Sequence, residues 1–170
     1  MSPEFLILRV VHVLGAIVWA GTSVFVAFFL SPAIGMAGPP GGAVMGALVK
    51  RKLFTIIPIV AVVMMLAGLR LIMILSGGFS AAWFGTRSGQ TYVVGAVGAL
   101  AAFALFMLVS HPAIGRSMKL SQQIAQAPEA ERGALTAELN AVRTRAGKAS
   151  MTSALILMLT AVAMSIGRYV

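Results

Sequence analysis

Four long apolar runs constrain this chain more than any other feature. The first covers residues 5–30, more than the roughly 20 residues that an α-helix needs to cross a bilayer core. The other three cover residues 53–75, 92–110 and 151–167. Inside a bilayer the backbone must satisfy its own hydrogen bonds, so each run is expected to form a membrane-spanning helix. The sequence predicts an all-α fold, a polytopic membrane four-helix bundle.

Composition supports a membrane protein. The 170 residues are 59% hydrophobic and 10% charged, against about 25% charged residues in an average soluble domain. The chain lacks cysteine, which excludes disulfides and thiolate metal sites. In so apolar a chain the net charge of +9 indicates membrane topology and lipid headgroup contacts, and we expect no nucleic-acid partner. The first run is longer than the apolar region of a signal peptide, so we expect it to be retained.

The connections between the runs differ in character. Helix 1 is expected to end at Ser31 and Pro32, and the Gly/Pro-rich stretch that follows has a turn composition. The only substantial polar segment lies between helices 3 and 4, at residues 112–150. Its apolar residues at helical spacing, Leu135, Leu139 and Val142, predict a cytoplasmic helical hairpin that extends helices 3 and 4. A solvated irregular connection is the alternative.

Basic residues give the expected orientation. Most of the Lys and Arg residues lie in the connections 1–2 and 3–4, at Lys50, Arg51, Lys52, Arg116, Lys119, Arg132, Arg143, Arg145 and Lys148. The positive-inside rule then places both termini outside, in the periplasm of a bacterial-type inner membrane.

An internal repeat suggests how the bundle is built. FLSPAIG at 29–35 reappears as VSHPAIG at 109–115, and the same 80-residue shift lays Gly15 on Gly95. We therefore expect two repeated helical hairpins. In helix 3, the pairs Gly95/Ala99 and Gly98/Ala102 have the small-xxx-small spacing that lets membrane helices approach closely.

One stripe of helix 1 carries the residues most suited to a site. His12, Gly15, Trp19 and Ser23 follow one another at helical spacing and should face other protein, since lipid offers no partner to histidine or serine. His12 is the best candidate ligand for a metal or haem, and an interhelical hydrogen bond is the alternative role. Trp19 either packs or relays electrons.

His111 is a poor second ligand to His12. The repeat puts His12 19 residues further outward, about 28 Å along the helix axis, so one iron cannot bind both within one chain. We expect His111 to cap a helix end or to lie at the membrane interface.

Other side chains could complete a site at His12. Arg9 and Arg70 are expected to form a cationic rim suited to haem propionates or an anionic lipid headgroup, unless they only reach toward the interface. A second axial ligand could be a methionine, and copper(I) also favours His with Met. The candidates at a suitable depth are Met64, Met65, Met158 and Met164. The four acids lie outside the predicted spans, so we expect no buried carboxylate for proton-coupled transport or a di-metal site, and we assign no catalytic residue.

These residues carry a family resemblance. His12-x6-Trp19-Ala20-Gly21 resembles the first-helix signature of CopD-like copper-resistance membrane proteins and of HemJ-type membrane protoporphyrinogen oxidases. The segment KRKLFTIIPIVAVVMMLAGLRL is similar to their second helix, so the likeness covers about the first 75 residues. It implies a haem-binding or copper-handling bundle with His12 as the family histidine. Helix 3 lacks the histidine and lysine that the oxidases place there, which argues against porphyrinogen oxidation and leaves it as the weaker alternative.

Two functions follow as expectations. The first is a small inner-membrane CopD-like protein that binds b-type haem or copper through His12, for electron transfer or metal handling. The second is an accessory subunit that has no cofactor and packs in a larger membrane complex or a homo-oligomer. They differ in what His12 does.

Overall fold

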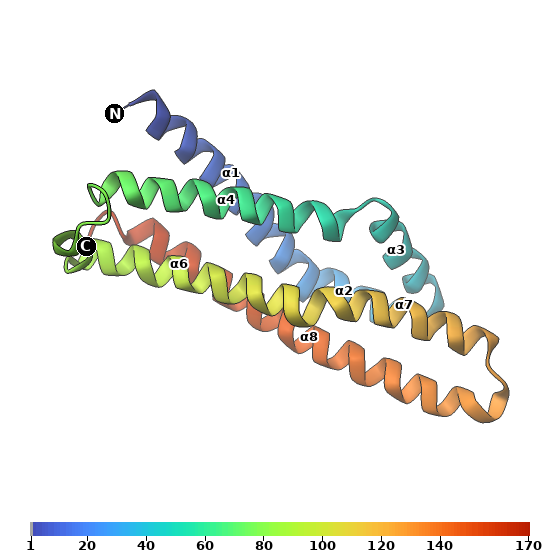
Figure 1. The fold of residues 1–170 in the computed structure, drawn as a ribbon. Coiled ribbons are helices and arrows are strands. Elements are labelled where there is room, and N and C mark those ends of the chain that lie inside the picture. The colour runs from blue at the N-terminus through green and yellow to red at the C-terminus, as the bar shows by residue number, and fades with distance from the viewer. Residues whose placement is uncertain (1) are drawn as a thin grey trace.

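The fold is a set of long helices that run side by side (Figure 1). The computed structural model describes residues 2–170, and every regular element in that range is helical. The α-helices are α1 (Pro3–Phe25), α2 (Ser31–Ala37), α3 (Pro39–Lys50), α4 (Leu53–Leu75), α5 (Ala81–Phe84), α6 (Arg87–Leu105), α7 (His111–Gln126) and α8 (Glu129–Ile166). Two π-helical turns connect some of these helices. Val26–Leu30 joins α1 to α2, and Phe106–Ser110 joins α6 to α7.

Four helical stretches within the described residues are long and apolar enough to span a membrane. They are Pro3–Ala37, Leu53–Leu75, Arg87–Gln126 and Glu129–Ile166. The chain is therefore all-α, with four helices of membrane-spanning length and composition. Both termini lie at one end of the molecule, and the turn between α7 and α8 lies at the other (Figure 1).

The expected end of helix 1 at Ser31 and Pro32 is wrong. The helix continues through the first π-turn and α2 to Ala37, and α3 replaces most of the expected Gly/Pro-rich turn. The break is confined to Gly38, whose positive φ of 62° suits a residue without a Cβ. Pro39 and Pro40 do not prevent α3 because they lie in its first turn, where no intrahelical N–H bond is needed.

Each π-turn stands directly before a proline-containing turn. Pro32 follows the first π-turn by two residues, and Pro112 follows the second by two residues. A proline ring inside a helix clashes with the carbonyl four residues earlier and leaves it without a donor. A π-turn has longer hydrogen-bonded loops than an α-turn, which changes where the earlier carbonyl lies relative to the proline ring. The chain can therefore stay helical through the proline, and the helix axis can change direction there. The two π-turns begin 80 residues apart, at Val26 and Phe106.

The four long helices pack mainly as two antiparallel pairs, α1 with α4 and α6 with α8. The pairs meet at a small apolar core made of Trp19, Ala61, Met64, Ala99, Ala102 and Leu157. In α6 the predicted small-residue face is the contact face, because Gly95 lies against Met164 and Gly98 lies against Thr160 of α8. This arrangement fits the close approach that small residues permit in membrane helices.

The polar segment between helices 3 and 4 is helical on both sides of a short turn at Ala127 and Pro128. α7 packs along the first half of α8, where Leu120 and Leu139 are buried. Arg116 of α7 forms an ion pair with Glu138 of α8 on the outside of this hairpin. The apolar residues at helical spacing therefore belong to a packed helical hairpin and not to an irregular connection.

Candidate functional site

His12 is held by a main-chain carbonyl of the neighbouring helix. Its Nδ1 lies 2.9 Å from the carbonyl oxygen of Met64 on α4, and the ring is partly buried. A carbonyl oxygen can only accept a hydrogen bond, so Nδ1 is the donor. In the uncharged ring the proton is then fixed on Nδ1, and Nε2 keeps a free lone pair. Metal-binding histidines are commonly oriented in this way by a bond from their other nitrogen.

Gly68 makes room for this arrangement. A Cβ at position 68 would lie 2.6 Å from Cε1 and 2.8 Å from Nδ1 of His12, closer than real carbon contacts allow. The Met64 carbonyl lies one helical turn before Gly68, and a carbonyl oxygen has two lone pairs, so it has capacity for a donor from outside its own helix. Gly68 and the Met64 carbonyl together form a notch on α4 that fits the imidazole ring.

The two arginines expected to form a cationic rim, Arg9 and Arg70, have different surroundings. Arg70 donates from Nε to Glu4 of α1 at 2.7 Å, and its Nη1 lies 3.4 Å from Sδ of Met73. Both charged side chains of the Arg70–Glu4 pair are about half exposed. Arg9 is exposed one turn before His12 on α1. The charged end of Arg70 is therefore engaged at the first turn of α1, eight residues or about 12 Å along the helix axis from His12.

The four candidate methionines have different surroundings. Met64 is buried in the core, where its Cβ and Cγ fill the space left by Gly15. Met164 fills the corresponding space beside Gly95 with its thioether end. Met158 is about half exposed on the outside of the bundle, and Met65 is partly buried beside the core. Met64 and Met164 thus serve as packing for glycine positions.

Trp19 and His111 both lie away from His12. Trp19 is 3% exposed in the core and makes an edge-to-face contact with Phe103 of α6, with ring centroids 6.2 Å apart. It follows His12 by seven residues, about 10 Å along the axis of α1. His111 is exposed beyond the second π-turn, with its ring 5.9 Å from that of Phe106. The structure brings His12 together with Gly68 and the Met64 carbonyl, and it brings Trp19 into the core.

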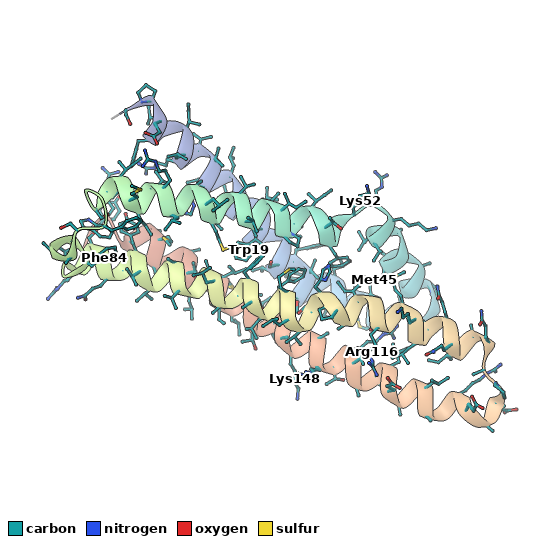
Figure 2. All side chains as sticks on the ribbon, in the orientation of Figure 1. Trp19, Met45, Lys52, Phe84, Arg116 and Lys148 are labelled. Atoms are coloured by element: carbon teal, nitrogen blue, oxygen red, sulfur yellow. The ribbon has the colours of Figure 1, made fainter. Side chains whose placement is uncertain are left out.

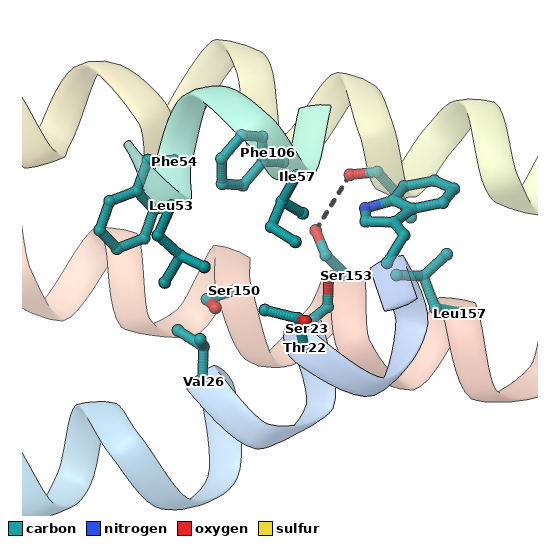
Figure 3. Close-up of a pocket in the computed structure, with 12 residues that line it drawn as sticks. Thr22, Ser23, Val26, Leu53, Phe54, Ile57, Phe106, Ser150, Ser153 and Leu157 are labelled. Atoms are coloured by element: carbon teal, nitrogen blue, oxygen red, sulfur yellow. Dashed lines mark hydrogen bonds between the residues drawn. The ribbon is translucent and has the colours of Figure 1, made fainter. Parts of the chain in front are cut away.

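Trp19 also borders a crevice where α1, α4, α6 and α8 meet (Figure 3). The hydroxyl residues Thr22, Ser23, Ser150 and Ser153 line the same crevice. Sequence analysis identified Ser23 as facing protein but not the serines of α8. Small polar residues at the start of an apolar run could have drawn attention to Ser150 and Ser153. That they lie beside Thr22 and Ser23 depends on the register of α8 against α1, which only the structure shows.

The part of the chain that the structure describes contains no group of three or more His, Cys, Asp or Glu side chains placed to hold a metal ion. A site at His12 would therefore rest on one histidine from this chain together with softer or external ligands. No family model, curated protein or solved structure matches the chain.

Proposed function

We propose that this chain is a small inner-membrane protein, similar to the CopD-like class, that holds b-type haem or copper at His12 near its outer side. The observation that carries the proposal is the bond from Nδ1 of His12 to the Met64 carbonyl. This bond gives the ring a fixed orientation and leaves Nε2 as the donor atom for a metal. Gly68 leaves the room in which this bond forms.

The residues fit such a group in part. His12 would supply one ligand through Nε2, and Met65, partly buried on α4 next to the residue whose carbonyl holds the ring, is the methionine proposed as the second ligand. Arg9, exposed one turn outward on α1, would pair with a propionate or another anionic group. When bound, haem or copper would supply a one-electron redox couple. The proposed role of His12, Gly68 and Arg9 is to bind the haem or copper and to orient it.

The proposal includes a duplicated architecture of two hairpins. Three pairs of features support it, because each member recurs 80 residues later on the first helix of the second hairpin. Gly15 faces Met64 as Gly95 faces Met164. The His12 ring lies on Gly68 as the Tyr92 ring lies on Gly167. The third pair is the two π-turns, which begin at Val26 and at Phe106. His12 therefore occupies a position at which the second hairpin carries a phenol.

The orientation is testable because the chain has no cysteine. With both termini in the periplasm, a single cysteine at Ser2 should react with a membrane-impermeant maleimide in intact cells. A cysteine at Ala127, in the turn between α7 and α8, should react only after the cells are opened. The opposite pattern would reverse the orientation.

A cofactor-free accessory subunit is the second candidate, and the thin core is compatible with it. Only 11% of the most apolar window of Pro3–Ala37 is buried within the chain, and 17% of that of Glu129–Ile166. Large apolar faces of membrane helices contact either lipid or other protein. A subunit that packs in a larger membrane complex or a homo-oligomer would cover such faces.

Absorption spectra of the purified protein distinguish the two functions. We expect a reduced b-type α-band or bound copper at about one equivalent per chain, measured in mild detergent with metal analysis. His12→Ala should remove the signal, and His111→Ala should keep it. Gly68→Ala, which crowds the ring without removing it, should shift the band or weaken binding. An unaltered signal in His12→Ala would exclude His12 as a ligand, and absence of any cofactor in the wild type would favour the accessory subunit.

A further inference from the structure

The crevice at Trp19 marks where the membrane-spanning part of the bundle ends. Residues of all four long helical stretches line it, among them Val26, Leu53, Phe106 and Ser150. These four positions therefore lie at one level of the bundle. From Leu53 the helix α4 continues for 23 residues, about 34 Å, which is enough to cross a bilayer core. The end of the membrane-spanning part thus lies close to Leu53.

Two helical projections extend beyond this level, and their compositions differ. One consists of α2 and α3, and the other of α7 and the first part of α8. In the second projection, residues 111–149 include nine charged side chains, which suits a segment in water. Residues 31–49 of the first include no charged side chain, and Ser31 is their only hydroxyl or amide side chain. The first projection is therefore apolar where the second is polar.

The helix α3 is apolar on its packed face and on its exposed face. On the packed face Gly41 lies against the backbone of Ile34 in α2, and Met45 is half-buried one turn later. The exposed residues of its central turns are Gly42, Ala43, Val44 and Ala47. Helices that are apolar on every side occur inside proteins or in lipid. α2 and α3 pack mainly against each other, the first π-turn and the start of α4, which leaves this face of α3 exposed.

The direction of α3 and the charges at its end favour a lipid surface as its neighbour. α3 runs across the direction of α4 (Figure 1), so it is oriented along the membrane surface when α4 spans the bilayer. Lys50, Arg51 and Lys52 follow directly and are exposed, and Figure 2 shows Lys52 at the outer edge of this turn. The four acids of the chain lie in α1 and α8. An apolar helix in the membrane plane beside a basic run is typical of a segment bound to an anionic lipid surface.

We infer that α3 lies in the headgroup region of the bilayer and that the basic run Lys50–Lys52 binds the phosphates of anionic phospholipids. Val44 of α3 and Met36 of α2, which is 85% exposed, contact the upper part of the acyl chains. Lysine and arginine form charge-assisted hydrogen bonds with phosphate oxygens. This inference rests on the long helices spanning a bilayer. It does not depend on a cofactor at His12 or on the side of the membrane that holds the termini.

Fluorescence quenching from lipid and from water tests the inference. The chain has no cysteine, so Val44→Cys gives one attachment point for a bimane label on the exposed face of α3. Ala137→Cys, at an exposed position of the polar part of α8, is the matched control. Each labelled full-length chain is reconstituted into vesicles of phosphatidylcholine and phosphatidylglycerol. We expect brominated acyl chains to quench the label at position 44, and iodide on both sides of the membrane to quench the label at position 137.

The headgroup contact is tested by comparing brominated phosphatidylglycerol with brominated phosphatidylcholine at equal mole fraction. We expect the anionic lipid to bind beside the position 44 label at least about fivefold more tightly, the preference expected from one basic residue near an anionic surface. Removing the three charges should bring this ratio to about one. The variant is Lys50→Gln, Arg51→Gln and Lys52→Asn, with asparagine at position 52 because Lys52 has a positive φ of 59°.

A second triple variant controls for the loss of net charge. It removes three positive charges from the α7–α8 hairpin, at Lys119→Gln, Arg132→Gln and Arg143→Gln, and should keep the preference. Quenching of the position 44 label by iodide but not by lipid would overturn the inference, because α3 would then lie in water. A label reached by neither quencher would overturn it in favour of a protein partner or a second copy of the chain. Equal quenching by the two brominated lipids in the chain with its native basic residues would exclude anionic headgroups as the partner.

Discussion

In each of the two helix pairs, α1 with α4 and α6 with α8, a glycine of one helix lies against a methionine of the other, but the two contacts differ in how freely the methionine can move. At Gly15 the nearest neighbour is Cβ of Met64, which is fixed to the backbone of α4. At Gly95 the nearest neighbour is Cε of Met164, the far end of a flexible side chain. The ring positions differ as well, because His12 binds a carbonyl of α4 while Tyr92 stacks on Trp83, with ring centroids 6.1 Å apart. The first hairpin is the more precisely fitted of the two, as the ligand site proposed at His12 would require.

Shortening the two methionines should give the largest difference. Met64 is 4% exposed in the core, so Met64→Ala leaves a cavity and should lower the free energy of unfolding by about 2–5 kcal/mol. Met164 is only partly buried, so Met164→Ala should cost clearly less. Thermal or denaturant unfolding in detergent, followed by circular dichroism, measures both. Equal losses would show that the hairpins are packed alike.

Adding a methyl group at the matching glycines should give the next largest effect. Gly15→Ala forces the α4 backbone to move and should cost about 1–3 kcal/mol, whereas at Gly95 the methionine end can turn away and the cost should fall below about 1 kcal/mol. Gly46→Ala in α3 is the control, since no atom lies within 4 Å of the added carbon. The same unfolding measurement applies. A greater loss at Gly95 than at Gly15 would contradict the difference in fit.

Removing charge from the two ion pairs should have the smallest effect. Glu4→Gln breaks the pair with Arg70 in the first hairpin, and Glu138→Gln breaks the pair with Arg116 beyond the second. Both pairs are exposed, so each loss should be about 0.2–1 kcal/mol and should shrink as salt is raised. Unfolding at low and high salt measures it. A large, salt-independent loss for Glu4→Gln would mean that the pair is shielded from water in the membrane protein.

Much of the fold is readable from the sequence, because apolar runs of this length have few alternatives. The helix α4 has the same bounds as its apolar run, Leu53–Leu75. The segment 33–42 was predicted to be a turn because of its glycines and prolines, and it is mostly helical. In the structure Gly41 is buried against the backbone of α2 at Ile34, so that glycine serves close helix packing. Composition alone does not separate these two uses of glycine.

The candidate site is less readable. His12 stands out as an ionisable residue in an apolar run, but its partner is a main-chain carbonyl, and every residue has one. Only the register of α1 against α4 shows that Gly68 uncovers the carbonyl of Met64. The ion pair of Glu4 with Arg70 depends on the same register, across 66 residues of sequence.

The length of α8 has a mechanical consequence. It runs from Glu129 to Ile166 as one 38-residue helix, about 57 Å long, while the helices beside it are each interrupted by a π-turn. At its far end Ser88 of α6 donates to the carbonyl of Gly167, which ties that end down. Because α8 is unbroken, the direction of its axis near Pro128 and near Gly167 is set together, whereas each of α1 and α6 is followed by a π-turn at which the axis can change direction.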